Sequence, residues 1–238
     1  MAVIRVASDS ALCVIFGDEI SEKINDRVRA FARAVEDARI PGVVETVPAY
    51  CAVTVHYAPE RIGYLRLYER LYGLLETAEA GAPEPGRVLS VPVLYGGDHG
   101  PDLAFVARHA GLTEAEAVAL HTAPDYRVYM LGFLPGFCYL GGLDERLHTP
   151  RLTTPRVRIP AGAVGIAGGQ TGIYPLPSPG GWQLIGQTPL RLYDPHRETP
   201  ILLEAGMTLR FYAVGPEEYE AVRRREYPEE YGEGGERL

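Results

Sequence analysis

Lysine is almost absent from this chain of 238 residues: Lys23 is the only one, and the other basic residues are arginines. A P-loop requires a lysine directly after its glycines, and none stands in such a position. A Schiff-base mechanism also requires a lysine, and Lys23 lies at the start of an expected surface helix. If this protein handles phosphate, arginine side chains or backbone N–H groups must bind it.

Cysteine and histidine are few and scattered, with three cysteines and six histidines. Three cysteines make neither a disulfide framework nor a zinc set. Cys13 and Cys51 lie in apolar runs typical of buried strands, and Cys138 has no neighbouring base that would activate its thiol. No His-x-His or His-Glu-x-x-His pair occurs, so we expect no metal site built by this chain.

Long apolar runs and excess positive charge are missing as well. No run is long enough to span a bilayer, and no basic segment followed by an apolar core marks a secretory signal. We therefore expect a cytoplasmic protein without membrane contact. The net charge of −8 disfavours nucleic-acid binding, which depends on neutralising phosphates.

The first part of the chain alternates strand and helix patterns. Ile24, Val28, Phe31 and Val35 recur at helical spacing, which places one apolar stripe on a helix. The expected elements are one or two strands in 4–16, a helix over about 21–39, strands over 43–47 and 51–57, and a helix opened by Pro59. This order predicts an α+β domain of ferredoxin-like type over residues 1–85. The Pro/Gly-rich segment Ala80–Gly86 is the expected domain boundary.

The second part, residues 86–215, is rich in short strand patterns separated by turn signals. Between His121 and Pro189, glycine and proline are interleaved with Phe, Tyr and Trp, which excludes a regular helix and a solvated linker. Helices are expected at 101–110 and after Thr113, which starts a capping box. Strands are expected at 88–95, 126–133, 164–167, 171–174, 182–185, 190–193, 201–203 and 208–214. The pattern predicts a mainly β barrel arranged around a pocket, followed by a charged C-terminal tail over 216–238.

Three charged residues are candidates for chemistry in this part. Arg151 and Arg156 each follow a proline, and a rigid loop can aim a guanidinium at a carboxylate or phosphate. Bonding of these arginines to backbone carbonyls is an equally good interpretation. His121 ends an expected helix, where a charged imidazole is favoured by the helix dipole; a general-base role is the alternative.

Four further residues could contact a small polar ligand. Gln170, Thr171 and Tyr174 fall in a glycine turn, where turn formation and aromatic packing are the simpler interpretation. Trp182, the only tryptophan, follows two glycines and is either part of the core or the wall of a pocket, with the core favoured.

Four motifs in fixed order carry a resemblance. They are Gly132-Phe-Leu-Pro-Gly-Phe-x-Tyr-Leu-Gly-Gly142, the two Pro-Arg pairs at 150–156, Gln170-Thr-Gly-Ile-Tyr-Pro175 and Pro179-Gly-Gly-Trp-x-Leu-Ile-Gly186. Together they resemble the family once called allophanate hydrolase subunit 1, over essentially the whole chain. That family includes the B-type subunit of a bacterial ATP-dependent 5-oxoprolinase, an inhibitor of a sporulation sensor histidine kinase, and a module related to the carboxyltransferase region of urea carboxylase.

The resemblance implies a cyclophilin-like barrel, a partner of similar fold that we call the C-type subunit, and a third subunit. It implies an ATP-dependent lactam hydrolase that converts 5-oxoproline to L-glutamate, with ATP and Mg²⁺ bound by the assembled complex. His121 and Arg156 are then the candidate catalytic residues. The candidate substrate-binding residues are Arg151, Gln170, Thr171, Tyr174 and Trp182. The alternative is a regulatory protein that binds a sensor histidine kinase and catalyses nothing; peptidyl-prolyl isomerase activity ranks last, because a fold does not carry a function.

Two departures from the family pattern concern anion binding. Members usually carry serine where this chain has Ala163, and arginine is common where Gln187 stands. Both changes remove a group that would contact phosphate, so we do not expect phosphate to be held at these two positions.

Overall fold

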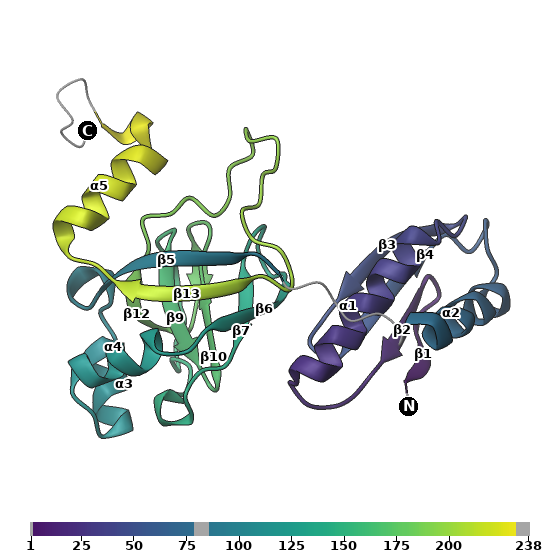
Figure 1. Ribbon diagram of the computed structural model, residues 1–238, viewed down its shortest axis with the longest axis horizontal. Helices are drawn as coiled ribbons and strands as arrows, with labels where there is room; N and C mark the ends of the chain where they lie inside the picture. The colour runs from purple at the N-terminus through teal and green to yellow at the C-terminus, as the bar shows by residue number, and fades with distance from the viewer. Residues whose placement is uncertain (1, 79–85, 232–238) are drawn as a thin grey trace. The chain divides into compact units, whose positions relative to one another are not determined.

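The computed structural model describes residues 2–78 and 86–231, which fall into two compact units, Met1–Pro85 and Gly86–Leu238 (Figure 1). The expected domain boundary, Ala80–Gly86, lies outside the described residues except for Gly86. The last seven residues of the expected tail, 232–238, lie outside them as well.

Unit 1 is a four-stranded antiparallel sheet with two helices. Its elements are β1 (Val3–Ser8), β2 (Ala11–Ile15), α1 (Glu22–Asp37), β3 (Val43–Pro48), β4 (Ala52–Tyr57) and α2 (Tyr64–Ala78), and the sheet order is β1-β2-β4-β3. Helix α1 buries Val28, Phe31 and Val35, as its periodicity predicts. The chain order is ββαββα rather than the βαββαβ of a ferredoxin-like motif, so the ferredoxin-like part of the prediction is not confirmed.

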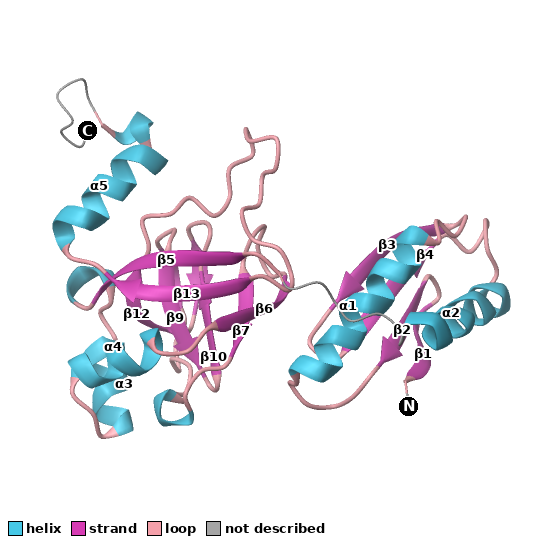
Figure 2. Ribbon diagram, viewed as in Figure 1, coloured by secondary structure: helices cyan, strands magenta, loops and turns pink. Residues whose placement is uncertain are grey.

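Unit 2 is built on a closed seven-stranded barrel with the order β10-β7-β6-β13-β5-β12-β9 (Figure 2). Its strands are β5 (Val88–Tyr95), β6 (Tyr126–Leu131), β7 (Cys138–Gly141), β9 (Ala163–Ala167), β10 (Gln170–Ile173), β12 (Gln183–Gln187) and β13 (Thr208–Ala213). All neighbours are antiparallel except β13 and β5, which run parallel. The prediction of a mainly β barrel is confirmed.

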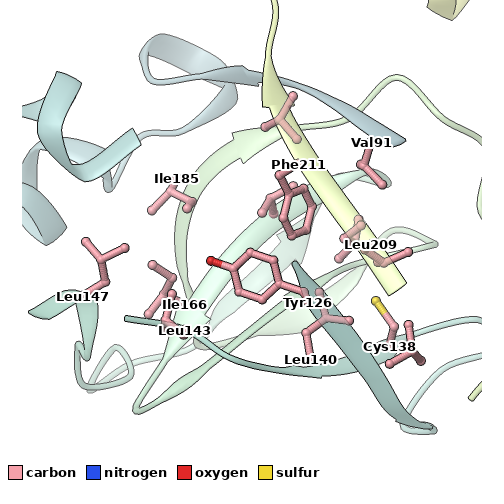
Figure 3. Packing of buried hydrophobic residues seen from close by; sticks show 14 of the residues in the cluster. Val91, Tyr126, Cys138, Leu140, Leu143, Leu147, Ile166, Ile185, Leu209 and Phe211 are labelled. Atoms are coloured by element: carbon pink, nitrogen blue, oxygen red, sulfur yellow. The ribbon is translucent and has the colours of Figure 1, made fainter. Parts of the chain in front are cut away.

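The barrel interior is a continuous apolar core. Val91, Tyr126, Leu140, Ile166 and Phe211 all point into it and are fully or almost fully buried (Figure 3). These residues come from strands far apart in the sequence, and closure of the barrel leaves no open edge between them. The space inside is therefore filled by side chains.

Within residues 86–231, three helices and a separate two-stranded sheet accompany the barrel. They are α3 (Leu103–Ala110), α4 (Glu114–Thr122), α5 (Pro216–Glu226), and β8 (Arg156–Ile159) paired with β11 (Ser178–Gly180). Three short 3₁₀ turns lie at 97–99, 145–147 and 228–230. Helix α4 starts with the capping box of Thr113 and Glu116, which is confirmed. Helix α5 covers the start of the expected charged tail and buries Tyr219, Val222 and Arg223.

Two predicted strands are wrong. Residues 190–193 and 201–203 form no named strand; a single bridge joins Tyr193 and Ile201. The segment between them contains prolines and turns instead of a strand. Ion pairs of Arg191 and Arg197 with Asp194 hold these turns. Three short strands, β7, β8 and β11, were not predicted as strands, because they lie in glycine- and proline-rich sequence where turn signals dominate.

Candidate functional site

His121 lies inside the barrel, close to the C-terminal end of α4. Its Nε2 is 2.9 Å from Oγ1 of Thr171, which itself donates to the carbonyl oxygen of Gly165 at 3.0 Å. The imidazole must therefore donate from Nε2, and Nδ1 of the neutral ring accepts from the Tyr95 hydroxyl at 2.8 Å. We call His121, Tyr95 and Thr171 the interior network.

Burial explains the charge state of His121. The residue is 1% exposed, and its ring packs against Tyr126 and Phe211 with centroids 5.4 and 4.8 Å away. This desolvation lowers the pKa of His121 from 6.5 to about 3, because a buried imidazolium would lose its hydration. Both ring nitrogens are engaged, so proton transfer by His121 would first require these bonds to break. Its general-base role stays a prediction.

A second group of predicted residues lies on the opposite side of the barrel wall. Successive strand residues face opposite sides, so Thr171 points inward and Gly172 outward. A Cβ at Gly172 would stand 3.1 Å from the Trp182 ring, so the glycine makes room for the indole. Trp182 packs edge-on against Phe137, whose ring also meets Tyr174, with centroid distances of 5.5 and 5.1 Å. Together with Tyr139, these rings form what we call the outer aromatic cluster.

Arg156 ties β8 to the start of α3 and to the segment around β12. Its guanidinium donates to the Asp102 carboxylate at 2.7 Å and to the carbonyl oxygen of Trp182 at 3.3 Å. The second oxygen of Asp102 accepts from the backbone N–H of Leu184 at 2.6 Å. With its charge balanced by a largely buried carboxylate, Arg156 holds three segments together, which matches the interpretation of these arginines as loop anchors.

Arg151, in contrast, is exposed and makes no ion pair within residues 2–78 and 86–231. Its positive charge acts on the Tyr174 hydroxyl. Burial raises the pKa of Tyr174 to about 12, and the charges of Arg151 and Arg156 partly oppose this rise. Tyr174 thus remains a neutral hydrogen-bonding group beside a cation that is available to an anion.

Gln170, a predicted site residue, lies apart from both groups, and Cys138, which was not predicted as one, lies in the barrel core. Gln170 stands at the far end of β10 from Tyr174, about 13 Å away along the strand. Cys138 is fully buried, and burial raises the pKa of its thiol to about 12, so it stays protonated. The structure therefore groups Arg151, Arg156, Tyr174 and Trp182 on the outer side of the barrel wall. His121 and Thr171 lie in the barrel interior, and Gln170 lies apart from both groups.

Sequence reasoning missed a cleft of about 830 Å³ in unit 2. Its lining comes from the β8–β9 connection, the 175–177 turn, the 187–196 segment and the end of α5 with the turn after it. The residues are Arg158, Pro160, Ala161, Pro175, Leu176, Pro177, Gln187, Arg191, Tyr193, Asp194, Pro195, His196, Arg223, Tyr227, Glu229 and Glu230. The only sequence signal for this cleft was Gln187, which departs from the family pattern. Its side-chain amide donates to the carbonyl oxygen of Ala161 at 2.7 Å.

The charges in this cleft are largely paired. Arg191 and Arg223 lie over the Tyr227 ring, with guanidinium carbons 4.1 and 4.6 Å from its centroid. Arg223 also donates to Glu230 at 2.8 Å, and Arg191 binds Asp194 and Glu229. Because these arginines are neutralised by neighbouring carboxylates, the cleft does not form a strongly cationic anion site.

Metal-ligating side chains do not gather in either place. Within the described parts of the chain, no group of three or more His, Cys, Asp or Glu residues is arranged to hold a metal ion. No described helix combines the length and apolar character needed to cross a membrane.

The chain belongs to the carboxyltransferase-domain family, subdomains C and D, whose model matches residues 2–203. It is 41% identical to the B-type subunit of 5-oxoprolinase from Bacillus subtilis (strain 168), over 92% of this chain and 96% of that protein. It is 53% identical to the B-type subunit of 5-oxoprolinase from Escherichia coli O157:H7, over 72% of this chain and 78% of that protein. A crystal structure of the protein TTHA0988 matches with a TM-score of 0.76 and 44% identity, over 90% of this chain but only 41% of that longer one.

Proposed function

We propose that this chain is the B-type subunit of an ATP-dependent 5-oxoprolinase, which opens the lactam of 5-oxoproline to L-glutamate together with partner subunits. The observation that carries this proposal is the similarity to proteins of that name over nearly the full length of both chains. The four motifs of the resemblance support it, because three of them contribute side chains to the outer aromatic cluster and Arg156 of the fourth bonds the Trp182 carbonyl.

The proposed reaction requires activation, because an unstrained lactam hydrolyses slowly. Transfer of the γ-phosphoryl group of ATP to the lactam oxygen releases ADP and makes the ring carbon electrophilic. Water then adds to that carbon, the C–N bond breaks with protonation of the nitrogen, and a second water hydrolyses the acyl phosphate to glutamate and phosphate. We assign ATP and Mg²⁺ to the assembled complex, which includes the C-type partner and a third subunit.

In this proposal the outer aromatic cluster is this chain's part of the substrate site. Arg151 binds the substrate carboxylate, because it is the exposed guanidinium beside Tyr174. Tyr174 and Trp182, which are 2% and 6% exposed, lie behind Arg151 and support it, and the Tyr174 phenol stays protonated at neutral pH. Arg156 acts as a positioning residue that holds the Trp182 carbonyl directly and the neighbouring Leu184 through Asp102, and His121 with Thr171 keeps β10 in place from inside the barrel.

The experiment is ATP-dependent release of glutamate from 5-oxoproline by this chain and its candidate partners, purified and assayed singly and together. We expect activity only in the full mixture. Arg151→Ala should lower kcat/KM by about 10- to 100-fold, the effect of losing one charged hydrogen bond. Arg108→Ala, an exposed arginine on α3, is the matched control and should leave turnover unchanged.

A full mixture that releases no glutamate, with every subunit folded and ATP present, would refute the proposal. The regulatory alternative would then predict inhibition of a sensor histidine kinase by this chain alone. Normal turnover by Arg151→Ala would leave the complex in place but remove Arg151 from the site.

A further inference from the structure

The loop between β6 and β7 presents one aromatic ring to solvent in a strained backbone conformation. Phe133 has a φ of +68° and is 64% exposed. A left-handed conformation costs a residue with a side chain about 1–2 kcal/mol, and exposed apolar area brings no compensating burial. A strained and exposed phenylalanine on an otherwise closed barrel points to a function for this ring.

The loop that carries Phe133 is held in place by its own hydrogen bonds. Gly132 N–H donates to the carbonyl of Phe137 at 3.1 Å, Leu134 N–H donates to Gly132 at 2.8 Å, and Phe137 N–H donates to Leu134 at 3.0 Å. The Phe133 ring meets the edge of the Phe137 ring at a centroid distance of 5.7 Å. The backbone that carries the ring is thus held in place before any partner arrives, so ordering this loop on docking would cost little conformational entropy.

The surroundings of Phe133 indicate what covers it. Phe137 links the ring to the outer aromatic cluster, where exposed Arg151 lies beside Tyr174. A surface that covered only Arg151 would bury an unpaired charge, which is costly unless an anion is enclosed with it. A partner protein with an apolar pocket would bury the Phe133 ring. If the same surface enclosed the substrate carboxylate at Arg151, the charge of Arg151 would be paired as well.

We propose that Phe133 is the anchor by which the C-type partner docks on this barrel and closes the substrate site at Arg151. This inference rests on the proposed function. The length of a solved relative supports the choice of occupant: in TTHA0988 the matched region makes up 41% of a longer chain, so it occurs covalently joined to further protein. A buried aromatic ring at the centre of an interface typically contributes a large share of its affinity.

Phe133→Gly tests the anchor without harming the fold. Glycine accepts a φ of +68° freely, so the substitution relieves strain while removing the ring. The dissociation constant of the complex with the purified C-type partner from the same source would be measured by isothermal titration calorimetry. We expect at least a 30-fold weakening, equal to about 2 kcal/mol, with no decrease in the Tm of unit 2.

The matched control is Phe105→Ala, which removes a 42% exposed ring on α3 and should leave the dissociation constant unchanged. At saturating partner, Phe133→Gly should recover wild-type kcat, whereas Arg151→Ala should not, because the first residue acts in docking and the second on substrate. A Phe133→Gly dissociation constant within threefold of wild type, in an active complex, would overturn the docking inference and leave the proposed function standing. Failure of the wild-type proteins to bind each other or to release glutamate would overturn both.

Discussion

The buried neutral state of His121 makes the stability of the barrel depend on pH. Its folded pKa of about 3 lies below the unfolded value of 6.5. Between these values the unfolded chain binds a proton at this residue and the folded chain does not. The contribution is therefore complete above pH 6.5 and is lost as the pH falls through 6.5 toward 3.

The size of the effect follows from these two pKa values. Well below pH 6.5 the loss is about 1.4 kcal/mol per pH unit, so the free energy of unfolding should fall by about 2 kcal/mol from pH 7 to pH 5 because of His121. The variant His121→Gln lacks the titrating group and should lose this share of the pH dependence, whatever its absolute stability. His196→Gln, at an exposed histidine of the same unit, is the control and should keep the wild-type dependence.

Trp182 provides a probe confined to the barrel. It is the only tryptophan of the chain and is 6% exposed, so its fluorescence reports the unfolding of unit 2 and not of unit 1. Urea unfolding of the wild type and both variants at pH 7 and pH 5 gives the required differences. Equal losses of stability in the wild type and in His121→Gln would refute the assignment of a neutral, desolvated His121.

Four other substitutions test local packing, backbone and capping effects. Gly172→Ala should destabilise the barrel by about 1–3 kcal/mol in the same fluorescence assay, since its Cβ would stand 2.7 Å from a backbone oxygen. Gly73 is exposed on α2 with open space at its Cβ position, so Gly73→Ala should stabilise unit 1 by about 0.5–1 kcal/mol, measured by circular dichroism. Asp102→Ala should cost about 2–4 kcal/mol because it leaves Arg156 and a backbone N–H unpaired; an unchanged urea midpoint would contradict this. Thr113→Ala should cost about 1 kcal/mol through loss of the α4 cap, and a change below about 0.3 kcal/mol would argue against it.

Local patterns predicted several elements well. The apolar spacing of Val28, Phe31 and Val35 predicted α1, and Thr113 with its glutamate three residues later predicted the start of α4. These signals depend on residues within one or two turns of each other, which sequence displays directly. The 190–193 and 201–203 strands were wrong because apolar content alone does not supply a strand partner.

The candidate site shows where local reasoning ends. Thr171 and Gly172 are neighbours in one motif, yet the barrel wall separates what they contact: the first joins His121 in the interior, and the second makes room for Trp182 outside. The pairing of Arg156 with Asp102, 54 residues earlier, carried no local signal. The cleft beside α5 likewise combines segments that the sequence holds apart.

The sequence by itself determined which reactive side chains the protein has: almost no lysine, scattered histidines and two arginines that each follow a proline. It also determined the motif set that resembles one family. Periodicity and turn residues also determined the mainly β barrel of the second unit and most element positions, but not the ferredoxin-like order expected of the first unit. Only the tertiary structure decided which of these residues meet, that His121 is buried and neutral while Arg151 is exposed, and that Phe133 faces solvent. The physical reason is that exposure, charge pairing and pKa depend on contacts between distant segments, and barrel closure sets those contacts.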